Sequence, residues 1–227
     1  MAMRRLLAAT LGFALLATLS GCASDDSAVI SPDTVISPDS SATRVAFYGD
    51  SYTLGTGASD PAQRWSTIIS TERGWSEFNP STNGLGFVNN RRSYGDGDEP
   101  SQVIADDPAI LFVTMGLNDN FSYETAAAKI KSQITADFTR LKTALPDARI
   151  IVVEPFWYTD ERPASVGIIM GWVKDAAASI GADYISGASH WIEGHPEWMA
   201  ADGLHPNDEG YAAMAVQMDA ALKKLGL

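Results

Sequence analysis

The stretch Arg44-Val-Ala-Phe-Tyr-Gly-Asp-Ser51 decides how this chain is expected to fold. Four apolar residues follow the arginine without a break, and the run stops at Gly-Asp-Ser. A short, continuous apolar run bounded by a turn is typical of a strand that is buried on both faces. Similar runs occupy 109–114 and 149–154, and a shorter one occupies 182–185. These four segments are the predicted strands.

Helical patterns lie between and after these strands. Apolar residues recur at helical spacing in 61–73 and 123–145, which predicts two helices. Two further helices are predicted at 165–180, closed by Gly181, and from Asn207 to about 224. Residues 74–100 are rich in Gly, Asn, Ser and Pro and are predicted to be mostly loop. Apolar strands that alternate with helices predict an α/β fold with a central parallel sheet in a three-layer α/β/α sandwich.

Length and charge limit the class of protein. The chain has 227 residues, enough for one sizeable folded domain, and a formal net charge of −12. An acidic surface repels phosphate backbones and anionic lipid headgroups, so we expect no nucleic-acid partner. The single cysteine, Cys22, excludes an intrachain disulfide and a thiolate metal cluster.

The N-terminus is predicted to be an export signal. Two arginines precede the apolar run 6–19, which is shorter than the roughly 20 residues that span a bilayer. Leu19-Ser-Gly-Cys22 then resembles a bacterial lipobox, and this resemblance implies that Cys22 becomes lipidated. An ordinary signal peptide with an incidental cysteine is the alternative.

The expected domain organisation follows from this signal. Residues 1–21 are expected to be the lipoprotein signal peptide, 22–43 the lipidated cysteine and a flexible tether rich in Ser, Asp and Pro, and 44–227 the single folded domain. The protein is therefore expected to be exported and held at the cell membrane by its lipidated N-terminus, with the domain outside the cytoplasm. No feature sets the oligomeric state, and we expect a monomer.

Three short motifs carry the chemistry. Gly49-Asp-Ser51 and Gly116-Leu-Asn-Asp119 each follow a predicted strand, and Asp202-Gly-Leu-His205 precedes the last helix. A serine hydroxyl, an asparagine amide and an Asp–His pair are the groups that nucleophilic acyl transfer needs. Each motif alone has a structural alternative, which is a helix cap for the first two and a turn for the third.

Together the motifs resemble those of the SGNH (GDSL-type) hydrolases. The resemblance covers about residues 44–227 and implies the flavodoxin-like α/β fold of that family and a serine esterase without cofactor or metal. It implies that Ser51 is the nucleophile, that His205 is its base and that Asp202 orients the imidazole. The oxyanion hole would combine the Ser51 N–H, the Asn118 amide and the N–H of Gly84, with Gly86 as the alternative.

The substrate is less defined than the chemistry. Short acyl groups, such as acetyl groups on carbohydrate or small molecules, are the preferred expectation. A lipolytic esterase or lysophospholipase of the same family and a tethered, non-catalytic binding module are the alternatives. Aromatic residues can line an acyl or sugar cleft, and core packing is the alternative for each of them. The five candidates are Trp157, Tyr158, Trp172, Trp191 and Trp198.

Overall fold

The structure, a computed structural model, describes residues 41–94 and 98–227. At its centre lies a five-stranded sheet with the order β2-β1-β3-β4-β5. All four pairings of neighbouring strands are parallel. The strands are β1 (Arg44–Tyr48), β2 (Ser76–Phe78), β3 (Ile110–Val113), β4 (Arg149–Val153) and β5 (Asp183–Ile185).

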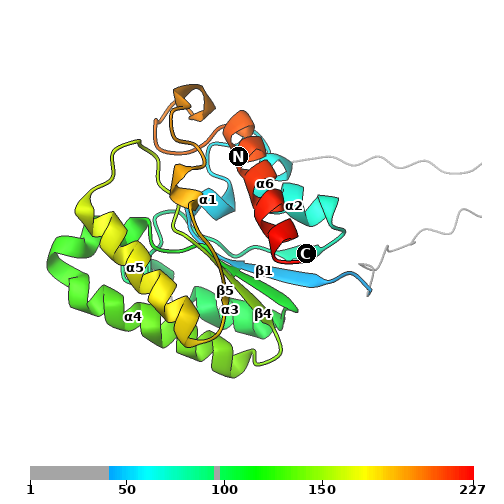
Figure 1. The fold of residues 1–227 in the computed structure, drawn as a ribbon, viewed down its shortest axis with the longest axis vertical. Coiled ribbons are helices and arrows are strands. Elements are labelled where there is room, and N and C mark those ends of the chain that lie inside the picture. Colours follow the sequence, from blue (N-terminus) through cyan, green and yellow to red (C-terminus); the bar gives the residue numbers. More distant parts are fainter. Residues whose placement is uncertain (1–40, 95–97) are drawn as a thin grey trace, which may run out of the picture. The chain divides into compact units, whose positions relative to one another are not determined.

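Helices cover both faces of this sheet (Figure 1). α2 (Trp65–Glu72) and α6 (Asp208–Lys224) pack against each other on one face. The other face is covered by α3 (Glu99–Asp106), α4 (Tyr123–Ala144) and α5 (Ala164–Ser179). The predicted three-layer α/β/α sandwich with a parallel sheet is therefore confirmed.

The strands are apolar throughout because both of their faces are buried. In β1, Val45 and Phe47 join the core under α2 and α6, whereas Ala46 and Tyr48 join the core under α3, α4 and α5. All four side chains are fully shielded from solvent. A strand between two cores has no face for polar residues, which explains the continuous apolar runs of the sequence.

The region predicted to be mostly loop, 74–100, holds three elements that the sequence did not reveal: β2, the 3₁₀ helix η2 (Arg91–Tyr94) and the start of α3. β2 is an edge strand of three half-buried residues, two of them polar, so it lacks an apolar run. The first turn of α3 begins at Glu99, and Asp98 caps it by accepting a hydrogen bond from the Ser101 N–H at 2.9 Å. The rest of the described part of 74–100 is loop, as predicted.

The predictions for the signal peptide, for Cys22 and for most of the tether concern residues 1–40, which lie outside the described residues. Within 41–94 and 98–227, no helix combines the length and the apolar character that crossing a membrane requires.

Candidate active site

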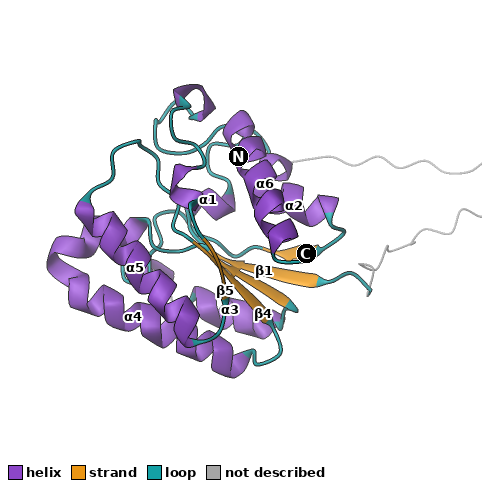
Figure 2. Ribbon diagram, in the orientation of Figure 1, coloured by secondary structure: helices purple, strands orange, loops and turns teal. Residues whose placement is uncertain are grey.

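The three motifs meet at the carboxyl ends of the strands. Ser51 opens the short helix α1 (Ser51–Leu54) directly after β1, and Asn118 opens the 3₁₀ helix η3 (Asn118–Ser122) shortly after β3. The segment between β5 and α6, which carries the Asp–His pair, folds over the same end of the sheet as α1 (Figure 2). In open parallel sheets this end is where ligands bind.

The turn before Ser51 is held by backbone and side-chain contacts. Asp50 caps α1, and its Oδ1 accepts a hydrogen bond from the Tyr52 N–H at 3.0 Å. Gly49 has no room for a side chain, because a Cβ there would lie 2.4 Å from the Thr114 hydroxyl oxygen. The Gly49 N–H donates to the buried Glu99 carboxylate at 2.8 Å. Ser51 is thereby fixed in a buried turn, 4% exposed.

Asp202 and His205 form the pair that the sequence suggested. His205 Nδ1 lies 2.6 Å from Asp202 Oδ2, and Asp202 Oδ1 accepts the N–H groups of Leu204 and His205 at 2.9 and 3.0 Å. These hydrogen bonds, chiefly the one with the His205 ring, lower the pKa of Asp202 to about 2. The carboxylate is therefore ionised at neutral pH, and His205 presents Nε2 away from it.

Tyr52 links this pair to the helix that carries Ser51. Its hydroxyl donates to the Leu204 carbonyl at 2.7 Å, and its ring lies 6.1 Å from the His205 ring, centroid to centroid. Burial raises the pKa of Tyr52, so the hydroxyl stays protonated as a donor. Sequence reasoning missed this residue, because a tyrosine after the serine reads as an ordinary helix position.

Asn118 joins the first motif to the loop after β2. Its Nδ2 donates to Asp50 Oδ2 at 3.2 Å and to the Leu85 carbonyl at 3.0 Å, and the residue is 7% exposed. The amide thus lies beside the turn that holds Ser51. An oxyanion bound at this amide would have to replace one of these two acceptors.

The two glycines proposed as oxyanion donors differ in their contacts. The Gly86 N–H donates to the Asn89 carbonyl at 2.9 Å, and a Cβ on Gly86 would lie 2.7 Å from the Asp119 carboxylate. The Gly84 N–H has no acceptor among the described residues, and Gly84 has a positive φ of 69°. Its carbonyl accepts from the side chain of Asn89 at 2.8 Å.

Asp119 acts on the backbone of this loop. Its carboxylate accepts the N–H groups of Phe87, Val88 and Asn89 at 2.7, 2.8 and 3.2 Å. Asp119 is fully buried, so these bonds fix the loop between β2 and α3 against η3. The geometry therefore gives Asp119 a structural role in holding this loop.

Buried carboxyl groups lie directly beneath the site. Burial raises the pKa of Asp50 to about 7, against the opposing effect of the Tyr52 N–H, and the neighbouring charge of Asp119 adds to the rise. Burial also raises the pKa of Glu99 well above its usual range. Strongly shifted acids at the carboxyl end of a parallel sheet are typical of a functional site.

A parallel α/β/α sandwich that gathers a serine, an asparagine and an Asp–His pair at the carboxyl ends of its strands defines the SGNH class of folds. Residues 47–213 match the GDSL-like Lipase/Acylhydrolase family, and the chain belongs to this family.

Similar proteins fit this class. The chain is 27% identical over 188 residues to the GDSL lipase Rv0518 of Mycobacterium tuberculosis. The matched region covers 75% of this chain and 78% of that lipase. In fold it is similar to the psychrotrophic esterase EstA of Pseudoalteromonas sp., with a TM-score of 0.65, 16% identity, and coverage of 81% of this chain and 98% of EstA. A two-domain esterase active on acetylated mannans gives a TM-score of 0.63 at 17% identity, over 81% of this chain and 49% of that protein.

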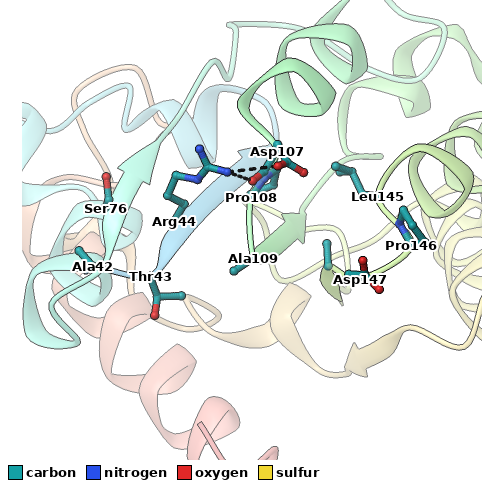
Figure 3. Close-up of a pocket in the computed structure, with 11 residues that line it drawn as sticks. Ala42, Thr43, Arg44, Ser76, Asp107, Pro108, Ala109, Leu145, Pro146 and Asp147 are labelled. Atoms are coloured by element: carbon teal, nitrogen blue, oxygen red, sulfur yellow. Dashed lines mark hydrogen bonds and ion pairs between the residues drawn. The ribbon is translucent and has the colours of Figure 1, made fainter. Parts of the chain in front are cut away.

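A hollow lies at the opposite end of the sheet from the three motifs, at the amino ends of the strands (Figure 3). It measures about 760 Å³ and is lined by the residues before β1, β3 and β4 and by the first residue of β2. The Arg44 side chain reaches across it to Asp107, with 3.4 Å between Nη2 and Oδ2. We call it the amino-end hollow.

Proposed function

We propose that this protein is a serine esterase that hydrolyses carboxylic esters, with short acyl groups such as acetyl on carbohydrate or small-molecule alcohols as its substrates. The observation that carries the proposal is the Asp202–His205 pair, which Tyr52 ties to the helix that begins at Ser51. A hydroxyl, an imidazole and a carboxylate on neighbouring segments form the set that activates a serine.

In the proposed reaction, Ser51 Oγ attacks the carbonyl carbon of the ester while His205 Nε2 takes the hydroxyl proton. The tetrahedral intermediate collapses, the carbon–oxygen bond to the alcohol breaks, and His205 returns its proton to that alcohol. Water then repeats the sequence on the acyl-serine and releases the carboxylic acid. No cofactor enters either half.

Asp202 stabilises the imidazolium that forms in both halves. Because its pKa is about 2, it keeps its negative charge throughout. Its bond to Nδ1 leaves Nε2 as the ring nitrogen that would take the serine proton.

The proposed oxyanion hole uses the Ser51 N–H, the Gly84 N–H and Asn118 Nδ2. Gly84 is preferred over Gly86 because the Gly86 N–H already donates to the Asn89 carbonyl. Asn118 would exchange its bond to the Leu85 carbonyl for the stronger bond to an oxyanion.

A lipolytic function is the second candidate. Phe121, three residues after Asn118, is 58% exposed, and the relative from Mycobacterium tuberculosis is called a GDSL lipase. An exposed aromatic ring near the site suits the acyl chain of a longer ester.

A chain-length series separates the two candidates. Purified protein is assayed on p-nitrophenyl acetate, butyrate and octanoate beside Ser51→Ala, and a fluorophosphonate probe reports on the serine. Turnover and labelling that vanish in the variant support the esterase, and a preference for octanoate supports the lipolytic candidate. A folded protein that neither turns over esters nor reacts with the probe contradicts the proposal and favours the binding module.

We further propose that Cys22 is lipidated and anchors the exported domain at the cell membrane. The support is the lipobox-like Leu19-Ser-Gly-Cys22 after a short apolar run. Metabolic labelling with a fatty-acid analogue should mark the wild type and spare Cys22→Ser. An unlabelled wild type would contradict the anchor.

A further inference from the structure

A second hollow lies beside the loop that carries the Asp–His pair. It measures about 400 Å³, and its lining includes Tyr158 and Asp160 after β4, His195, and Ala200 and Gly203 in the catalytic loop. We call it the site-side hollow. Its lining includes Ala201 and Gly203, the residues on either side of Asp202 in the sequence. A ligand in this hollow would therefore contact the loop that carries the Asp–His pair.

Tyr158 places this hollow near the nucleophile helix. It packs on the core cluster that contains Tyr52 and Phe156. Burial chiefly raises the pKa of Tyr52, and Tyr158 is among the neighbours whose charge adds to the rise. Of the five aromatic candidates from the sequence, Tyr158 is the one that lines this hollow, and Trp157 is buried behind it.

Two rings of the hollow are held in place before any ligand arrives. Tyr158 packs on Trp157 with 4.7 Å between ring centroids, and the Trp157 Nε1–H donates to the Glu161 carbonyl at 3.0 Å. His195 stacks on Trp198 with 3.6 Å between centroids and 10° between planes. Rings that are already ordered bind a flat, partly apolar surface with little loss of side-chain entropy.

Polar groups stand next to these rings. Asp160 Oδ1 accepts the Gly194 N–H at 2.9 Å, whereas Asp160 Oδ2 and the Tyr158 hydroxyl have no partner within the described part of the chain. An alkyl chain laid here would cover these groups without bonding to them, which is unfavourable. A sugar ring presents hydroxyls to such groups and C–H faces to the rings.

The charge of the hollow selects among sugars and headgroups. Asp160 is an exposed carboxylate of the lining, Asp202 lies between the lining residues Ala201 and Gly203 in the sequence and is ionised, and the whole chain has a net charge of −12. Phosphate and carboxylate groups are repelled from such a surface. The ligand expected here is therefore a neutral sugar.

We propose that the site-side hollow is a subsite for a neutral sugar ring, namely the alcohol part of the ester that Ser51 attacks. This inference rests on the proposed esterase function and names its substrate class. The sugar would stack on Tyr158 and bond to Asp160, so that an acyl group on one of its hydroxyls points toward Ser51.

The test compares two esters in each variant. One is p-nitrophenyl acetate, which has no sugar, and the other is an acetylated neutral mannooligosaccharide. Tyr158→Ala should lower the ratio of kcat/KM for the sugar ester to kcat/KM for p-nitrophenyl acetate by about tenfold. This is the fold-change expected from the loss of one aromatic contact. Tyr158→Phe keeps the ring and should retain most of the ratio. Tyr184→Ala, a half-buried tyrosine of β5 outside the hollow, should leave the ratio at the wild-type value.

A binding measurement separates this inference from the esterase proposal. Unmodified mannopentaose is titrated into folded Ser51→Ala protein and into Ser51→Ala/Tyr158→Ala protein, followed by NMR shifts or calorimetry. Binding that weakens in the double variant supports the subsite even if no ester is turned over. Esterase activity with an unchanged ratio in Tyr158→Ala and no sugar binding overturns the subsite and leaves the esterase intact. A ratio that falls equally in Tyr184→Ala also overturns it.

Discussion

The two ends of the sheet differ in how their side chains are held. At the carboxyl end, Ser51 and Asn118 are nearly buried, and hydrogen bonds join segments far apart in the sequence. At the amino end, the amino-end hollow is nearly twice as large as the site-side hollow, but it is lined by short loops and an exposed Arg44–Asp107 pair. Its described lining contains neither a histidine nor an amide side chain.

Under the proposed function, the reaction takes place at the carboxyl end and not at the larger hollow. The carboxyl end is where parallel strands place polar residues in a buried, hydrogen-bonded setting, in which side-chain positions and pKa values differ from those in water. The following predictions test the contrast, from the largest expected effect to the smallest.

Exchanging one serine at each end gives the largest contrast. Ser51→Ala should lower kcat on p-nitrophenyl acetate by about 10⁴-fold or more, because no other group takes the place of a lost nucleophile. Ser76→Ala, at the amino-end hollow, should keep the wild-type rate. Equal rates in the two variants would show that the site has been placed at the wrong end.

Asn118→Ala should slow turnover by about a hundredfold to a thousandfold, since one lost oxyanion donor costs about 2.7–4 kcal/mol of barrier. The fall should appear in kcat more than in KM. Asn120→Ala is the neighbouring control, because Asn120 bonds to Ser165 on α5 and not to the nucleophile turn. A rate for Asn118→Ala within threefold of wild type argues against the assignment.

The buried Asp50 should make stability depend on pH. Its pKa of about 7 lies above the value of about 4 for an unfolded aspartate, so folding takes up a proton between these two values. This contribution is present in full below about pH 4 and is lost as the pH rises through about 7. Between about pH 5 and 8 it should remove roughly 2–3 kcal/mol from the free energy of unfolding.

Urea unfolding of wild type and Asp50→Asn at these two pH values measures the effect. Asparagine still caps a helix but does not titrate, so the variant should show a smaller fall in the free energy of unfolding over this interval. The readout is the difference between the two pH values and not the absolute stability. The same fall in both proteins would assign the pH dependence to other groups.

Tyr52→Phe should reduce kcat about fivefold to tenfold while the protein stays folded. The change removes only the hydroxyl that donates to the Leu204 carbonyl, a hydrogen bond worth about 1 kcal/mol. His205 then has more freedom, so the loss should fall on kcat and leave KM nearly constant. Tyr123→Phe, whose ring stacks on Trp172 away from the Asp–His loop, provides the control. An equal effect of the two changes would point to general loosening.

The smallest effect is expected at the amino end. Arg44→Ala breaks an ion pair whose side chains are 52% and 83% exposed, so thermal or urea unfolding should show a change below about 1 kcal/mol. Ester turnover should remain at the wild-type rate. A large loss of activity would mean that the two ends are coupled more strongly than their contacts indicate.

The sequence was sufficient to predict the architecture and the end of the sheet at which its three motifs gather. The runs 44–48, 109–114 and 149–154 predicted the buried strands because an apolar run needs no partner to be visible. The sequence did not predict β2, because an edge strand of three half-buried residues has neither a continuous apolar run nor a clear alternation of apolar and polar residues. The loop after β2 holds the bond from the Gly86 N–H to the Asn89 carbonyl, which distinguishes Gly84 from Gly86 and has no signature in the sequence.

The cross-links of the site could not be read from the sequence. The bond from Tyr52 to Leu204 joins residues 152 positions apart, and the bond from Asn118 to Leu85 joins residues 33 positions apart. Such pairs depend on how the helices pack on the sheet, and no local sequence pattern predicts them. The motifs predicted which side chains lie together, whereas the hydrogen bonds that position these side chains depend on packing.

The link between α1 and the end of the chain also sets when activity can arise. Tyr52 and Thr56 are bonded to Leu204 and to Tyr211 of α6, at separations of 152 and 155 residues. Contacts of such long range form late and slowly in folding. The turn that carries Ser51 therefore reaches its final geometry only when the last helix, α6, has docked on the sheet.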